Sequence, residues 1–232
     1  MTELRQLSVN WLESTLFFNR GDRFEARPLP TPAQLAPAFA VSAADFDGDG
    51  HMDVFLSQNF FATDPEVDRH DGGRGLVLRG DGNGNFSPMP ASVSGLRIYG
   101  EQRAAAVADY DRDGRPDLAV SQNGQVTRLF HNRGGRPGLR VRLVGPPGNP
   151  YALGATLRLQ SNGRHGPVHE LHGGSGYLSQ DEPIALLASK ESPDAVVVRW
   201  PGGRETRSPI PPSAKSARVH SDGRLEVLDP LP

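Results

Sequence analysis

Short apolar runs, each followed by a cluster of Gly, Asp or Asn, recur along the chain. Small apolar residues fill Phe39–Ala44 and Ala104–Ala108. Branched or aromatic residues fill Val54–Leu56 and Leu118–Val120. Runs this short that end in turn-forming residues are typical of buried β-strands. Because no helical pattern of useful length is present, the chain is predicted to be all-β.

Part of this pattern occurs twice. Residues 44–59 and 108–123 are identical at nine of 16 positions and lie 64 residues apart. A second element at Leu16–Phe24 resembles Val77–Phe86, and Leu129–Gly134 repeats its first half. Strand–turn–strand units of about 50–65 residues suggest the four-stranded blades of a β-propeller.

The repeat sets the expected domain boundaries. Residues 1–30 are expected to supply the outer strands of an incomplete blade, and residues 31–135 to form two blades. Phe60–Gly75 is expected to be a polar surface loop. In residues 136–232 the repeat stops and strands with one buried face are expected instead, at Leu139–Val144, Thr156–Gln160 and Ala195–Trp200. These alternating strands predict a second, small β-domain.

Composition excludes several classes of protein. The chain has 27 Gly, 21 Pro and no Cys in 232 residues, with a net charge of −2. The absence of Cys excludes a disulfide scaffold, a thiolate zinc site and a cysteine nucleophile. The small net charge gives no general attraction for nucleic acid. No apolar run is long enough for a membrane span, and Met1–Arg5 lacks the pattern of a signal peptide.

Acidic residues gather in the two copies of the repeat. Four Asp fall within nine residues in each copy: Asp45, Asp47, Asp49 and Asp53, then Asp109, Asp111, Asp113 and Asp117. Carboxylates held this close repel one another unless they protonate or share a cation. Both clusters are therefore candidate metal sites.

The spacing in both copies is Asp-x-Asp-x-Asp-Gly-x-x-Asp. Carboxylates at positions 1, 3 and 5 converge if the loop curls, and Gly50 or Gly114 at position 6 permits the turn. The carbonyl at position 7, of His51 or Arg115, then points inward, and the Asp at position 9 closes the shell. Oxygen ligands in this number favour Ca²⁺ over zinc or copper.

Acidic loops of this kind also occur in EF-hands and in turns that merely solvate. An EF-hand carries a bidentate Glu at position 12 between two helices. Position 12 is Leu56 or Val120 here, within a predicted strand, which excludes the EF-hand. A solvated acidic turn would account for one copy, but two copies at matched positions favour a metal site.

The two Asp loops, each followed by an apolar strand and Ser-Gln-Asn, resemble FG-GAP/VCBS repeats, the calcium-loop blades of integrin-type β-propellers. This resemblance implies that each loop joins the first two strands of a blade and that the chain holds two Ca²⁺ ions. The ligands it implies are Asp45, Asp47, Asp49, the His51 carbonyl and Asp53, then Asp109, Asp111, Asp113, the Arg115 carbonyl and Asp117.

The C-terminal part resembles the ASPIC/UnbV domain, which follows such repeats in cartilage acidic protein-like proteins. The matching segments are Leu153–Ala155, His172–Gln180 and Val198–Gly203, whereas Leu186–Ser189 departs from the usual Gly-Leu-Gly. Propellers of this kind close with more blades than this chain supplies, and an open one leaves sheet edges exposed. We therefore expect the chain to be the C-terminal part of a longer exported protein, extracellular or periplasmic, or to be completed by another chain.

The sequence thus predicts a partial β-propeller with calcium loops and a small C-terminal β-domain. Its expected role is non-catalytic recognition or adhesion, with an unknown protein or glycan as ligand. The alternative is a hydrolase with Ser175 as nucleophile, His172 or His169 as base and Asp181 as orienting residue. The Gly-rich segment lacks the G-x-S-x-G of a nucleophile elbow, which favours a packed β-turn. His169 and His172 are expected to face opposite sides of a strand.

Two smaller features follow from ordinary local structure. Arg20-Gly21-Asp22 and Arg79-Gly80-Asp81 both spell the tripeptide that integrins read, but turn chemistry accounts for both. Trp11, Trp200 and the Phe residues are expected in the core.

Overall fold

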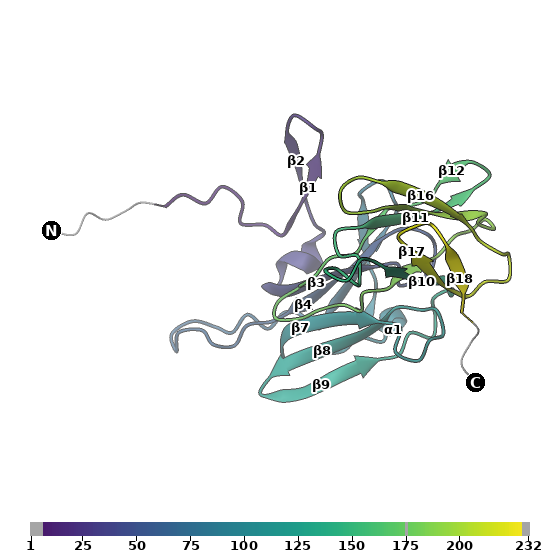
Figure 1. Cartoon of the computed structure of the whole chain (residues 1–232). Coiled ribbons are helices and arrows are strands. Elements are labelled where there is room, and N and C mark those ends of the chain that lie inside the picture. Colours follow the sequence, from purple (N-terminus) through teal and green to yellow (C-terminus); the bar gives the residue numbers. More distant parts are fainter. Residues whose placement is uncertain (1–6, 175, 229–232) are drawn as a thin grey trace.

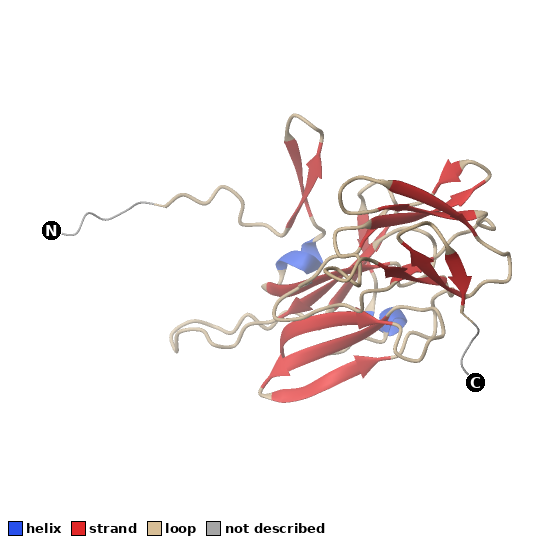
Figure 2. Cartoon of the chain, in the orientation of Figure 1, coloured by secondary structure: helices blue, strands red, loops and turns tan. Residues whose placement is uncertain are grey.

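A computed structural model describes residues 7–174 and 176–228 (Figure 1). Within them the chain forms five β-sheets, and its helices are the short 3-10 helix Thr31–Gln34 and α1 (Ala91–Ser94) (Figure 2). Neither of these helices has the length and apolar character needed to cross a membrane. The prediction of an all-β chain is confirmed.

The N-terminal sheet is a separate hairpin. Strand β1 (Thr15–Asn19) pairs antiparallel with β2 (Phe24–Pro28) as a two-stranded sheet (Figure 1), and its Phe18 ring lies against Gly84. Trp11 is 57% exposed and lies edge-on against Phe17, which is itself exposed. The expectation of a core position is therefore wrong for Trp11, Phe17 and Phe24.

The first repeat forms a four-stranded antiparallel sheet. Its strands, in spatial order, are β3 (Ala38–Ala44), β4 (Asp53–Gln58), β5 (Leu76–Gly80) and β6 (Phe86–Pro88). The first Asp loop (residues 45–53) joins β3 to β4. Residues 60–75 connect β4 to β5 as a mostly exposed loop, as expected, with a bridge between Phe60 and His70.

The second repeat forms a sheet of three strands. They are β7 (Glu101–Ala108), β8 (Asp117–Asn123) and β9 (Gln125–Phe130), and the second Asp loop (residues 109–117) joins β7 to β8. Four strands were expected in this sheet. After β9 the chain turns back toward the Asp loops and enters β10 instead of returning beside β9, which leaves most of β9 exposed.

The two repeats pack through their first strands, β3 and β7. Ala40 and Ala105 are fully buried where these strands meet, and small side chains allow the close approach. Phe55 and Val120, from the second strands, lie in the same apolar cluster. Small residues in the first strands therefore bring the two repeats close together.

The C-terminal sheets (β10–β18) enclose a second core. One has the order β14-β10-β17-β18, and the other has the order β12-β11-β15-β16 with β13 beside β11. Their strands are β10 (Leu139–Val144), β11 (Thr156–Ser161), β12 (Arg164–His165), β13 (His169–Glu170), β14 (Ala185–Leu187), β15 (Ala195–Arg199), β16 (Glu205–Pro209), β17 (Ser216–His220) and β18 (Leu225–Val227). Trp200 lies in their shared core, as expected.

Alternation of buried and exposed positions holds in β10 and β11 but fails in β15. Residues Ala195–Val198 are all buried. On the face away from the core, Val197 is opposite Arg158 on β11 and Arg207 on β16. The aliphatic stems of long arginine side chains cover such a position, so this strand is buried on both faces.

Candidate metal sites

The first Asp loop is shaped by its own carboxylates. Asp45 accepts hydrogen bonds from the backbone N–H groups of Asp49 (3.0 Å) and Gly50 (2.8 Å). Gly50 has φ 90°, a value that glycine adopts without strain. One oxygen atom from each of Asp45, Asp47 and Asp53 lies within 4.8 Å of the other two. Positions 1, 3 and 9 therefore converge.

The second Asp loop repeats this geometry. Asp109 accepts a hydrogen bond from the N–H of Gly114 (3.2 Å), which has φ 86°. Oxygen atoms of Asp109, Asp111 and Asp117 lie within 4.8 Å of one another. The same three positions of the motif therefore converge in both loops.

The carboxylates at position 5 lie outside these convergent groups and pair with arginines. An oxygen of Asp49 lies 3.2 Å from a guanidinium nitrogen of Arg79, and Asp113 pairs with the side chain of Arg115. Asp49 and Asp113 were expected to converge with the other ligands, but neither is in the three-oxygen group of its loop. The carbonyls of His51 and Arg115 stay predicted ligands.

The Asp at position 9 also ties each loop to its sheet. Asp53 accepts hydrogen bonds from the backbone N–H of Phe46 (3.0 Å) and of Gly80 at the end of β5 (2.9 Å). Asp117 accepts the corresponding bonds, including one from the N–H of Asn132 just after β9 (2.7 Å). Each loop is thus anchored to the third strand of its own sheet.

The buried carboxylates lack full charge compensation. Burial raises the pKa of Asp53 to about 6, and it also raises the pKa values of Asp45, Asp109 and Asp117. The Oδ1 atom of Asp109 is buried and has no hydrogen-bond partner among the described residues. Clustered carboxylate oxygens in this state fit a hard divalent cation such as Ca²⁺.

Basic side chains from other segments face these carboxylates. Arg79 Nε lies 2.6 Å from Asp47, His131 Nε2 lies 2.9 Å from Asp111, and Arg140 Nε lies 3.4 Å from the second oxygen of Asp109. His131 also forms a candidate three-ligand group with Asp111 and Asp113. The sequence pattern did not indicate these three side chains, because they come from other segments of the chain.

Both copies of Arg-Gly-Asp follow from the local structure. Gly21 has φ 91° in the turn of the β1–β2 hairpin. In the second copy Arg79 contacts the first Asp loop, and Gly80 is buried at the end of β5.

The linker (residues 132–138) lies between the two Asp loops. The side-chain amide of Asn132 donates to the carbonyl of Phe46 in the first loop (2.7 Å) and of Pro116 in the second (3.2 Å). The N–H of Arg136 donates to the carbonyl of Asp47 (3.1 Å). Asn132 is the counterpart of Asn19 in the repeated Asn-Arg-Gly, which is the one sequence signal for this contact.

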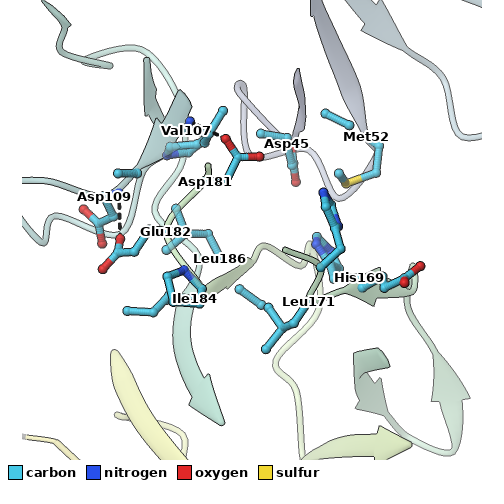
Figure 3. A pocket seen from close by; sticks show the side chains of 18 of the residues that line it. Asp45, Met52, Val107, Asp109, His169, Leu171, Asp181, Glu182, Ile184 and Leu186 are labelled. Atoms are coloured by element: carbon cyan, nitrogen blue, oxygen red, sulfur yellow. Dashed lines mark hydrogen bonds between the residues drawn. The ribbon is translucent and has the colours of Figure 1, made fainter. Parts of the chain in front are cut away.

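A pocket of about 280 Å³ lies between the Asp loops and the C-terminal sheets (Figure 3). Its lining includes His169, His172 and Asp181. The two histidines were expected on opposite sides of a strand, but they line one pocket because β13 ends at Glu170 and the alternation ends with it. Burial lowers the pKa of His169 to about 4. Ser175, the proposed nucleophile, lies outside the described residues.

Known protein families match most of the chain. A model described as an FG-GAP-like repeat matches residues 7–56 and 60–120, a span that includes both Asp loops, and a model described as ASPIC and UnbV matches residues 145–223. Cartilage acidic protein 1 of Mus musculus is 27% identical over 218 residues, which cover 90% of this chain and 31% of the relative. The Homo sapiens protein is 26% identical with the same coverage. The chain therefore spans about a third of the length of these relatives.

Proposed function

Because the chain combines FG-GAP-like repeats with an ASPIC/UnbV domain and is a distant homologue of cartilage acidic protein 1, we propose that it is a calcium-binding, non-catalytic module for recognition or adhesion. Each Asp loop binds one Ca²⁺. The observation that supports this most directly is the convergence of positions 1, 3 and 9 in both loops.

The role of Ca²⁺ in this proposal is structural. The ion is held by carboxylates at the convergent positions, with position 5 and the carbonyl at position 7 as further ligands. It removes the repulsion between carboxylates that burial has deprived of water. Calcium sites of extracellular modules have dissociation constants of roughly 10⁻⁴–10⁻³ M. A site of this affinity would be filled only where calcium is abundant, so the proposed place of action is extracellular or periplasmic.

The repeats act as part of a larger β-propeller. In this proposal residues 1–30 contribute the outer strands of one blade, residues 31–135 form two more, and residues 136–232 form the ASPIC/UnbV domain. Further blades come from a longer parent chain or from another chain. The exposed strand β9 and the hairpin β1–β2 offer sheet edges for such additions. The ligand is a protein or a glycan.

Calcium titration of the whole chain tests this function. Isothermal titration calorimetry of protein stripped with a chelator is expected to show two Ca²⁺ ions bound per chain, at submillimolar to millimolar concentration. Mg²⁺ should bind more weakly, because it requires a stricter octahedral geometry. Binding of no divalent cation at these concentrations would refute the proposal.

A hydrolase remains the alternative function, because the pocket brings His169, His172 and Asp181 together. A screen with ester, peptide and glycoside substrates tests it. An activity that disappears in Ser175→Ala, while the thermal melting curve stays unchanged, would support the hydrolase. Equal activity in the wild type and the variant would exclude Ser175 as the nucleophile.

A further inference from the structure

The two Asp loops share a ligand pattern but differ in the arginine beside them. In the first loop, Arg79 comes from β5 of the same sheet and its side chain is 53% exposed. Lys190 of the C-terminal domain lies 3.9 Å from Asp49 in this loop, but its side chain is 54% exposed. In the second loop, Arg140 comes from β10 of the C-terminal sheets and its side chain is 15% exposed. The carboxylate of Asp109, which Arg140 faces, is fully buried. The charge beside the second loop is therefore supplied by the C-terminal domain, and it is much less exposed to solvent than Arg79.

Arg140 is held in place by a second acidic residue. One oxygen of Glu182 lies 2.6 Å from a guanidinium nitrogen of Arg140, and the other accepts a hydrogen bond from the backbone N–H of Asp109 (3.1 Å). Figure 3 shows Glu182 extending toward Asp109, with a dashed line for the hydrogen bond between them. Arg140, Glu182 and Asp109 thus form one contact between the two domains.

This contact belongs to a larger docking surface, formed by residues 181–182 of the C-terminal domain against β7. Asp181 accepts a hydrogen bond from the N–H of Val107 (2.7 Å), and the N–H of Glu182 donates to the carbonyl of Val107 (2.9 Å). These bonds hold Glu182 beside β7. To move away from Asp109, the side chain of Arg140 would therefore have to give up its ion pair with Glu182.

A cation bound in the second loop must share Asp109 with Arg140. One oxygen of Asp109 faces Arg140 at 3.4 Å, and the other is buried without a hydrogen-bond partner among the described residues. Two positive charges on one buried carboxylate repel each other, and the effect is large where water is excluded. Arg79 does not impose this penalty on the first loop to the same degree, because an exposed arginine can turn into solvent at little cost.

We propose that Arg140 is a built-in cation of the second Asp loop, through which the docked C-terminal domain lowers the calcium affinity of that loop below that of the first. This inference rests on the proposed calcium-binding function. Because such coupling is reciprocal, Ca²⁺ in the second loop weakens the attachment of Arg140 to Asp109 by the same factor. The C-terminal domain then acts mainly on the second calcium site, because Lys190, its cation beside the first loop, is exposed.

The experiment measures CaCl₂ binding to each loop separately in the full-length chain. Asp47→Ala with Asp49→Ala leaves only the second loop, and Asp111→Ala with Asp113→Ala leaves only the first. Calorimetry is expected to give a weaker affinity for the second loop. Adding Arg140→Gln to the protein with only the second loop should raise its affinity about tenfold.

Two further variants separate charge from structure. Arg140→Lys keeps the positive charge, so the second loop should stay within about twofold of its original affinity. Arg79→Gln in the protein with only the first loop should change its affinity less than about threefold, because Arg79 is exposed. Melting curves in chelator establish that each variant is folded.

The outcomes distinguish this inference from the proposed function. If no variant binds Ca²⁺, the proposed function itself fails. If both loops bind Ca²⁺ but Arg140→Gln and Arg140→Lys behave alike, Arg140 is not a regulator and the calcium-binding function stands. Should Arg140→Gln not fold, the comparison between the two single-loop proteins decides, and equal affinities would overturn the inference.

Discussion

The side-chain amide of Asn132 donates a hydrogen bond to the carbonyl of Phe46, 86 residues earlier in the chain, at 2.7 Å. The same amide reaches the carbonyl of Pro116 in the second Asp loop. Its oxygen accepts bonds from the N–H groups of Gly134 and Gly135. One side chain therefore connects the linker to both candidate metal sites, beside the backbone bonds that the linker makes to each loop.

Asn132→Ala is expected to destabilise the protein by about 1–3 kcal/mol, because it leaves partly buried backbone groups without partners. For a chain of this size that corresponds to a fall in Tm of several degrees. Urea denaturation followed by circular dichroism measures the change. Asn83→Ala, in the exposed turn after β5, is the matched control and should change stability by less than about 0.5 kcal/mol. Equal stability of the two variants would show that Asn132 does not hold the loops together.

Asp47→Ala and Asp111→Ala are each expected to reduce the rise in Tm that millimolar CaCl₂ produces, because each disables one of the two sites. Asp111→Ala should remove the smaller share, because the second loop is expected to bind Ca²⁺ more weakly. The double variant should show no calcium response at all. Differential scanning fluorimetry with CaCl₂ or chelator measures this. Asp64→Ala, in the exposed loop 60–75, serves as the control for loss of an acidic residue and should keep the full response. A full response in the double variant would place the calcium sites elsewhere.

The Asp loops were predictable from the sequence because their geometry is local. Nine consecutive residues bring positions 1, 3 and 9 together, and the turn depends on a glycine within the same nine residues. The repeat made the four strands around these loops predictable for the same reason. Gly50 and Gly114 both have the positive φ that the motif requires.

What the sequence pattern did not show depends on contacts between distant segments. Arg140 is 31 positions from Asp109 and on another domain, so no spacing rule connects them. The three-stranded second sheet follows from the path of the linker, which the hydrophobic pattern does not encode. Burial of Val197 likewise depends on arginines of two neighbouring strands.

His169 makes stability depend on pH. Burial lowers its pKa to about 4, below the value of about 6.5 expected in the unfolded chain. Since the unfolded chain then binds a proton more readily, stability from this group is complete above pH 6.5 and is lost as pH falls toward 4. The difference in pKa corresponds to at most about 3.4 kcal/mol.

His169→Asn is expected to flatten this part of the pH profile, with the free energy of unfolding changing less between pH 7 and pH 4.5 than in the wild type. Urea denaturation at several pH values in chelator measures it. His165→Asn is the control, because His165 is exposed on β12. If both variants keep the slope of the wild type, His169 is not the group responsible.

Gly48, at position 4 of the first Asp loop, lies against the linker. Its φ is +70°, but the counterpart in the second loop is Arg112 with φ 64°, so a positive φ alone does not require glycine here. The linker requires glycine at this position, because a Cβ at Gly48 would clash with the carbonyl oxygen of Arg136.

Gly124 is the matched control, because it has nearly the same φ, +69°, and no atom lies within 4 Å of the position of a Cβ. Gly124→Ala should therefore cost about 1–2 kcal/mol from backbone strain alone, whereas Gly48→Ala should cost at least about 2 kcal/mol more because the linker must shift. Chemical denaturation of the two variants measures the difference, and equal costs would mean that the linker does not press on the first loop.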